Sequence, residues 1–90
     1  MNINETLAVR ETRYGEYMDV ATIAQNLKFV MQQSVNWNHL EADQMESLDM
    51  IANKIARILN GDPNYDDSWH DIAGYATLVA ERLRKGQVMK

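Results

Sequence analysis

Four acidic residues in the second half of the chain have a spacing that suits a metal site. Glu46 and Asp49 are three residues apart, and Asp67 and Asp71 are four residues apart. Residues three or four apart lie on the same face of an α-helix, so each pair points in one direction. If the two helices that carry these pairs run antiparallel and side by side, we expect the four carboxylates to meet in one groove.

Carboxylates in such a group are typical ligands of Mg²⁺, with Mn²⁺ as the second candidate. Mg²⁺ binds few protein oxygens and keeps waters, which leaves coordination positions for phosphate oxygens. Lys54 and Arg57 flank the first acidic pair. Their positive charges would neutralise a phosphate while a metal-bound water attacks it.

The same acidic residues also fit an ordinary solvated helix surface. Glu46 and Asp49 could simply share a solvated helix surface with Lys54 and Arg57, where exposed charges interact only weakly. Asp67 could serve only to cap the first turn of the helix that follows it. Both interpretations stay open at the level of the sequence.

One feature of the last predicted helix favours contact on its acidic face. Gly74 and Leu78 share that face with Asp67 and Asp71. A solvent-facing stripe seldom contains leucine, or a mid-helix glycine that costs about 1 kcal/mol relative to alanine. We therefore expect this face to pack against another helix or a ligand.

The elements that must position these residues are all helical. Apolar residues recur at three- and four-residue steps, while strand-like alternation is nearly absent. The pattern predicts helices over 5–13, 18–35 and 41–60, and a fourth from about 66 or 67 that ends before Gly86. The residues expected to form the apolar stripe of this last helix are Trp69, Ile72, Ala73, Ala76, Val79, Ala80 and Leu83. The stripe of the helix before it consists of Met45, Leu48, Ile51, Ala52, Ile55, Ile58 and Leu59.

One short and three long amphipathic helices predict an all-α bundle, with residues 1–90 as a single domain. The chain carries nine basic and thirteen acidic residues, a net charge of −4, which argues against general nucleic-acid binding. It has no cysteine, so disulfides and cysteine-bound zinc are excluded. With neither a membrane-spanning stretch nor a signal peptide expected, a cytoplasmic protein is predicted.

Three segments carry a resemblance to a known group of proteins. They are the run from Glu46 to Leu59, the Gly61-Asp62-Pro63 turn, and the run from Asp67 to Ala76. With the segment from Arg10 to Gly15, they resemble a phage and prophage domain family of unknown function. That family is similar in pattern to the all-α nucleotide pyrophosphohydrolases of the MazG and dimeric dUTPase type.

The resemblance implies a MazG-like fold and Mg²⁺-dependent cleavage of a nucleoside triphosphate between its α and β phosphates. It implies metal ligands at Glu46, Asp49, Asp67 and Asp71, and catalytic roles for Glu46, Asp49, Lys54 and Asp71. Lys54, Arg57, Tyr14 and Trp37 are then the expected nucleotide contacts. Since those enzymes complete their sites between subunits, a homodimer or homotetramer is also expected.

Two departures from the enzyme pattern support a second hypothesis. Asp43 and Gln44 occupy the region where the enzymes carry a further glutamate, and the second acidic pair is spaced by four residues instead of three. The alternative is a non-enzymatic phage accessory protein that binds a host protein or a nucleotide.

Overall fold

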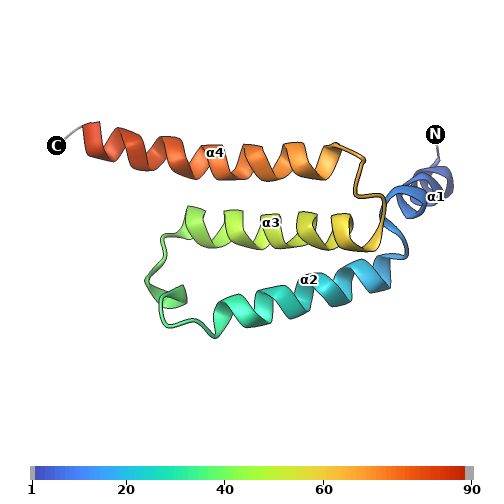
Figure 1. Ribbon diagram of the computed structural model, residues 1–90, viewed down its shortest axis with the longest axis horizontal. Coiled ribbons are helices and arrows are strands. Elements are labelled where there is room, and N and C mark those ends of the chain that lie inside the picture. Colours follow the sequence, from blue (N-terminus) through green and yellow to red (C-terminus); the bar gives the residue numbers. More distant parts are fainter. Residues whose placement is uncertain (1, 89–90) are drawn as a thin grey trace.

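The computed structural model describes residues 2–88, and over that range it contains four α-helices and one short 3₁₀ helix (Figure 1). The prediction of an all-α fold is confirmed, because the described residues form no strand. The elements are α1 (Ile3–Tyr14), α2 (Tyr17–Gln32), η1 (Trp37–His39), α3 (Ala42–Asn60) and α4 (Asp67–Val88).

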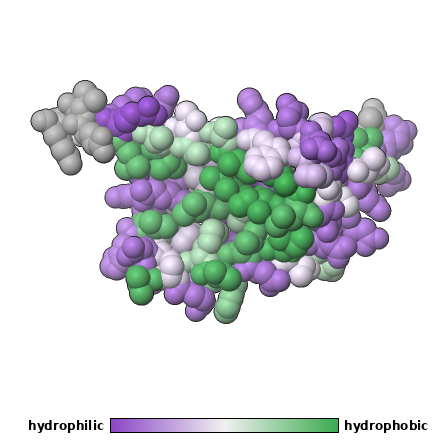
Figure 2. Space-filling model, in the orientation of Figure 1, coloured by the Kyte–Doolittle hydropathy of each residue, from purple (hydrophilic) through white to green (hydrophobic). Residues whose placement is uncertain are grey.

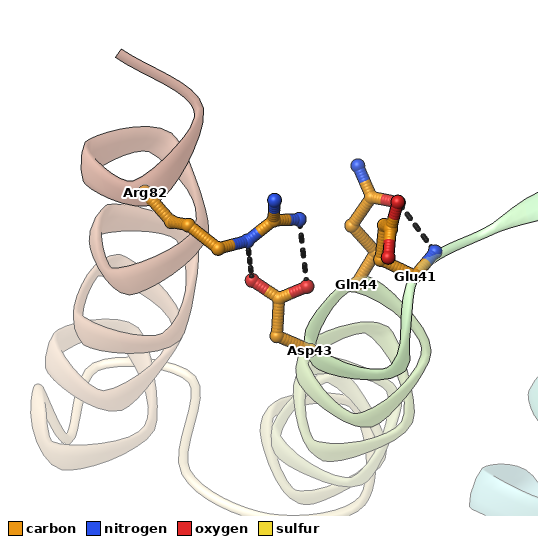
Figure 3. A network of polar contacts seen from close by, with 4 residues as sticks. All are labelled: Glu41, Asp43, Gln44 and Arg82. Atoms are coloured by element: carbon orange, nitrogen blue, oxygen red, sulfur yellow. Dashed lines mark hydrogen bonds and ion pairs between the residues drawn. The ribbon is translucent and has the colours of Figure 1, made fainter. Parts of the chain in front are cut away.

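Polar side chains stabilise the starts of α1 and α3. The side chain of Asn2 accepts a hydrogen bond of 2.9 Å from the backbone N–H of Glu5. At the start of α3, the side chain of Gln44 accepts one of 2.8 Å from the backbone N–H of Glu41 (Figure 3). These bonds satisfy backbone groups near the helix start that lack partners within the helix.

Two helix ends differ from the sequence prediction. The second helix ends at Gln32, three residues early, where the hydroxyl of Ser34 donates a hydrogen bond of 2.8 Å to the carbonyl of Met31. The prediction that α4 ends before Gly86 is wrong, because the helix continues to Val88. Among the described glycines, a positive φ occurs at Gly15, directly after α1 (φ 80°, ψ −170°), and not at Gly86.

The three long helices form a single layer with α3 in the middle (Figure 1). Helix α3 packs against α2 on one side and α4 on the other, and its two neighbours run antiparallel to it. Helix α1 lies at the end of this layer, next to the start of α2 and the end of α3 (Figure 1). The molecule is a small helical bundle of elongated shape, 50 × 28 × 23 Å.

The buried core is small and lies between α2 and α3. It consists of Val20, Ala24 and Ala56, with Tyr14 and Ile23 packed against it. The alanines let the two helices approach closely, because a methyl group is the largest side chain between the backbones at those points. Little apolar surface is buried in this core, so it contributes only part of the stability that a longer chain would obtain.

Many large apolar side chains remain exposed. Trp69 (55% exposed) and Leu59 (67% exposed) were predicted to lie in apolar packing stripes, and that prediction is wrong for this chain. These side chains are exposed because the three long helices form a single layer. Each helix packs only against the helices beside it, and its two remaining faces stay open to solvent. Figure 2 shows the result, a continuous hydrophobic area over the middle of the layer.

An ion pair joins α3 and α4 at one end of the layer (Figure 3). The guanidinium of Arg82 binds both carboxylate oxygens of Asp43, at 2.5 and 2.8 Å. This hydrogen-bonded guanidinium holds the pKa of Asp43 below its ordinary value. The pair therefore connects the first turn of α3 to the last third of α4.

None of the helices within residues 2–88 combines the length and the apolar character needed to cross a membrane.

Candidate ligand-binding site

The end of α1 is held tightly against the end of α3. The side-chain amide of Asn60 donates a hydrogen bond of 3.1 Å to the carbonyl of Tyr14. The backbone N–H of Asp62 donates one of 2.8 Å to the carbonyl of Arg13. Gly61 allows this approach, because a β-carbon there would overlap the Arg13 carbonyl and the Tyr14 backbone. These contacts fix the position of Tyr14.

Tyr14 lies at the centre of a group of charged and aromatic side chains. The guanidinium of Arg57 lies over its ring, 4.7 Å from the ring centre. Its hydroxyl donates a hydrogen bond of 3.3 Å to Asp67, at the start of α4. The ring of Tyr65 is tilted against it at 6.3 Å, and the guanidinium of Arg13 lies 4.1 Å above the Tyr65 ring. Residues of α1, α3, α4 and the segment between α3 and α4 thus meet at this tyrosine.

The surroundings of Tyr14 keep its hydroxyl protonated. Burial raises the pKa of Tyr14 above its ordinary value of 10.0, and the negative charge of Asp67 raises it further. The positive charge of Arg57 acts in the opposite direction but does not reverse the shift. At neutral pH the side chain is therefore a neutral phenol that donates a hydrogen bond.

A cavity of about 460 Å³ opens beside Tyr14, between α1, α2 and α3. Its size falls within the usual range for small-molecule sites. Its lining residues are Leu7, Arg10, Glu11, Tyr14, Gly15, Tyr17, Val20, Asn53 and Arg57. The lining thus combines two guanidinium groups, one carboxylate, two phenol rings and an amide with a few apolar side chains.

Sequence reasoning identified only part of this cavity. It selected Tyr14 and Arg57, and the structure brings them into direct contact. It did not assign a binding role to Arg10, Tyr17 or Asn53. The spacing of Arg10 and Tyr14, four residues apart on one helix, was the available signal, because such residues share a face.

Two other predicted nucleotide contacts lie elsewhere. Trp37 is in η1, at the opposite end of α3 from Tyr14 (Figure 1). Lys54 is 8% exposed, and its ammonium forms an ion pair of 3.0 Å with Asp71 of α4. Neither Trp37 nor Lys54 lines the cavity beside Tyr14.

The four candidate metal ligands have separate environments within one chain. Glu46 is exposed to solvent, and Asp49 has one buried carboxylate oxygen without a hydrogen-bond partner. Asp67 accepts the hydrogen bond from Tyr14, and Asp71 is paired with Lys54.

Within residues 2–88, no three histidine or acidic side chains come close enough together to hold a metal ion. The structure of a single chain therefore does not bring the four predicted ligands together in one group. The metal-binding roles of these acidic residues stay predictions.

The structure is that of a small helical-bundle protein with a cavity lined in part by two arginines and two tyrosines. Residues 3–83 match a family model described as "Domain of unknown function (DUF6378)", and the chain belongs to that family. No curated protein matches the chain. No solved structure matches it either.

Proposed function

We propose that this protein binds a nucleotide in the cavity between α1, α2 and α3. The observation that carries the proposal is the placement of Arg57 over the ring of Tyr14 at the wall of this cavity. The ring restricts the guanidinium by a cation–π contact and leaves its edge N–H groups free to donate. A held guanidinium is well suited to bidentate contact with phosphate oxygens.

A second arginine supports an anionic ligand. Arg10 also lines the cavity, and neither Arg10 nor Arg57 forms an ion pair among the described residues. Two unpaired guanidinium groups on one cavity attract phosphate groups more strongly than one. Glu11 shares the lining and opposes this attraction, so the phosphate is expected next to the arginines on the side away from Glu11.

An aromatic side chain at the rim is available to the nucleobase. Tyr17 lines the cavity, and 81% of the residue is exposed. An exposed phenol ring offers a flat surface on which a base stacks. Asn53 adds both a donor and an acceptor on α3, which suits recognition of a base edge or a sugar hydroxyl.

A Mg²⁺-dependent nucleoside triphosphate pyrophosphohydrolase is the second candidate. One observation favours it, the buried and unpartnered oxygen of Asp49, four residues before Asn53 on α3. Such an oxygen is costly to bury unless a donor or a cation satisfies it. The remaining ligands among Glu46, Asp67 and Asp71 would then have to come from a second chain.

The biological setting belongs to the same proposal. The resemblance to phage domains and to MazG-like enzymes supports a role in phage nucleotide metabolism in the host cytoplasm. The nucleotide-binding proposal is one form of the non-enzymatic function considered from the sequence. Binding of a host protein is its other form.

Thermal melting with a panel of nucleotides tests the proposal. A ligand that binds only the folded state at 100 times its Kd stabilises that state by about 2.7 kcal/mol, which is a shift of roughly 10–20 °C in melting temperature for a protein of this size. We expect such a shift with at least one mononucleotide, and we expect Arg57→Gln to reduce affinity about tenfold or more. Lys28→Gln, on α2 outside the cavity lining, is the control for the loss of one positive charge.

The outcomes separate the two candidates. Binding that is the same with and without Mg²⁺, with no pyrophosphate released, supports the binding protein. Release of pyrophosphate that requires Mg²⁺ and is lost in Asp49→Asn supports the enzyme. If no nucleotide shifts the melting temperature, or if Arg57→Gln binds as tightly as the wild type, the proposed site is wrong.

A further inference from the structure

An apolar groove runs between α3 and α4, outside the cavity described above. Its volume is about 360 Å³. Its lining residues are Leu40, Gln44, Ser47, Leu48, Ile51, Ala76, Val79, Ala80 and Leu83. Seven of these nine side chains are apolar, and two of the large ones, Leu48 and Leu83, are 39% and 41% exposed. An open groove of this composition exposes apolar surface to water at a cost in free energy.

The chain as a whole exposes more surface than its mass predicts. Its accessible surface is 6710 Å². A compact monomer of 10.4 kDa is expected to expose about 5,400 Å², so the excess is roughly 1,300 Å². The radius of gyration is 15.5 Å, where about 12 Å is expected for a globular chain of this length. The cause is the single layer of helices, which leaves both faces open.

The excess surface has the size of an interface in a permanent dimer. Such interfaces bury about 1,000 Å² or more of each chain and resemble a domain core. We propose that a second copy of this chain covers the α3–α4 groove. The α3–α4 pairs of the two copies then pack face to face as a four-helix bundle, in which each groove receives the exposed leucines of the other copy.

The charges beside the groove fit a second copy in one orientation. Glu41 precedes α3 and is adjacent in sequence to Leu40 of the groove, and Arg84 lies near the end of α4, adjacent to Leu83 of the groove. Because α3 and α4 are antiparallel, these two charged residues lie at the same end of the layer (Figure 1). Both residues are exposed and form no ion pair among the described residues.

A two-fold axis parallel to the helices places α3 of one copy against α4 of the other. The acidic start of α3 then faces the basic end of the partner's α4, twice in each dimer. All neighbouring helices in the resulting bundle are antiparallel, which is the usual arrangement in four-helix bundles with short loops. The same surface is thus complementary to itself in both shape and charge, as a two-fold interface requires.

Sedimentation equilibrium of the full chain tests this interface, and the test does not depend on nucleotide binding. We expect the wild type to have twice the monomer mass of 10.4 kDa at micromolar concentration. Leu83→Asp places a charge in the groove and is expected to weaken dimerisation at least a hundredfold. Leu78→Asp, on an exposed leucine of α4 outside the groove, is the matched control and is expected to remain dimeric. Far-UV circular dichroism of each variant checks that the helices persist.

A charge exchange keeps the proposal testable if Leu83→Asp fails to fold. Arg84→Glu is expected to weaken the dimer severalfold, and adding Glu41→Lys is expected to restore it. A wild type that sediments at 10.4 kDa over the whole concentration range would overturn the proposal and leave the groove to a different protein. A dimer that survives both Leu83→Asp and Arg84→Glu unchanged would also overturn it.

Discussion

The guanidinium of Arg57 lies 4.7 Å above the ring centre of Tyr14, and this contact joins the last turns of α3 and α1. The same tyrosine donates a hydrogen bond to Asp67 at the start of α4. One side chain therefore connects three helices at the end of the layer where the cavity lies. Stability and ligand binding are both expected to depend on it.

Truncation of Tyr14 tests this dependence. Tyr14→Phe removes the hydrogen bond to Asp67 and keeps the ring under Arg57, so we expect a loss of about 0.5–1.5 kcal/mol in the free energy of unfolding. Tyr14→Ala also removes the ring, and the loss is expected to rise to about 2–4 kcal/mol. Urea unfolding followed by circular dichroism measures both values. Equal losses in the two variants would show that the ring contributes nothing.

The ion pair between Lys54 and Asp71 gives the second prediction. The side chain of Lys54 is 10% exposed and that of Asp71 is 34% exposed, so the pair is only partly shielded from water. Breaking a fully buried pair costs about 3–5 kcal/mol, and we expect Asp71→Asn to cost about 1–3 kcal/mol here. The double variant Lys54→Met/Asp71→Leu is expected to recover most of this loss, because no unpaired charge remains.

A double-mutant cycle on the free energies of unfolding measures that coupling. If Lys54→Met, Asp71→Leu and the double variant have strictly additive effects, the pair contributes no interaction energy. Asp62→Asn, at an exposed turn position without an ion pair among the described residues, is the control for a simple change of charge.

The pair between Asp43 and Arg82 gives a prediction about pH. Hydrogen bonding to Arg82 holds the pKa of Asp43 below its ordinary value of 3.8. The folded state therefore binds a proton at Asp43 less readily than the unfolded state does. The stabilisation is present above pH 3.8, and it is lost as the pH falls through the lower pKa of the folded state.

Melting temperatures measured from neutral pH into the acid range check this expectation. Because the side chains of Arg82 and Asp43 are 46% and 39% exposed, the effect is expected to be small and to shrink at high salt. Asp43→Asn should show a shallower decline of melting temperature in acid than the wild type. A decline of the same steepness in both proteins would mean that other carboxylates account for it.

Two glycines provide a matched pair for the fourth prediction. A β-carbon at Gly61 would overlap the backbone of Arg13 and Tyr14, whereas one at Gly74 meets no atom within 4 Å. Gly61→Ala is expected to destabilise the fold by at least about 2 kcal/mol, because backbone atoms must move apart. Gly74→Ala is expected to stabilise it by about 0.5–1 kcal/mol, through the higher helix propensity of alanine.

Thermal unfolding of the two variants side by side measures this difference. If Gly61→Ala melts at or above the wild-type temperature, the close contact between the α1 and α3 ends is not a determinant of stability. If Gly74→Ala lowers the melting temperature, its face of α4 is packed against something other than the described part of this chain.

Local sequence patterns were sufficient to predict the helices. The end of α3 at Asn60 was predicted correctly because Gly61 and Pro63 follow it, and the starts of α3 and α4 were predicted to within a residue. Helical periodicity and terminal residues act within a few positions, so a single chain segment contains them. The end of α4 was missed because a glycine in a helix is penalised but not forbidden.

Only the tertiary structure decided which side chains meet. Periodicity assigns a residue to a face of its helix, but it contains no information about the element that covers that face. Lys54 pairs with Asp71 of α4, and Arg57 meets Tyr14 of α1, because α3 lies in the middle of the layer with different neighbours on each side. For the same reason Trp69 lies half exposed on a helix whose apolar stripe suggested a buried position.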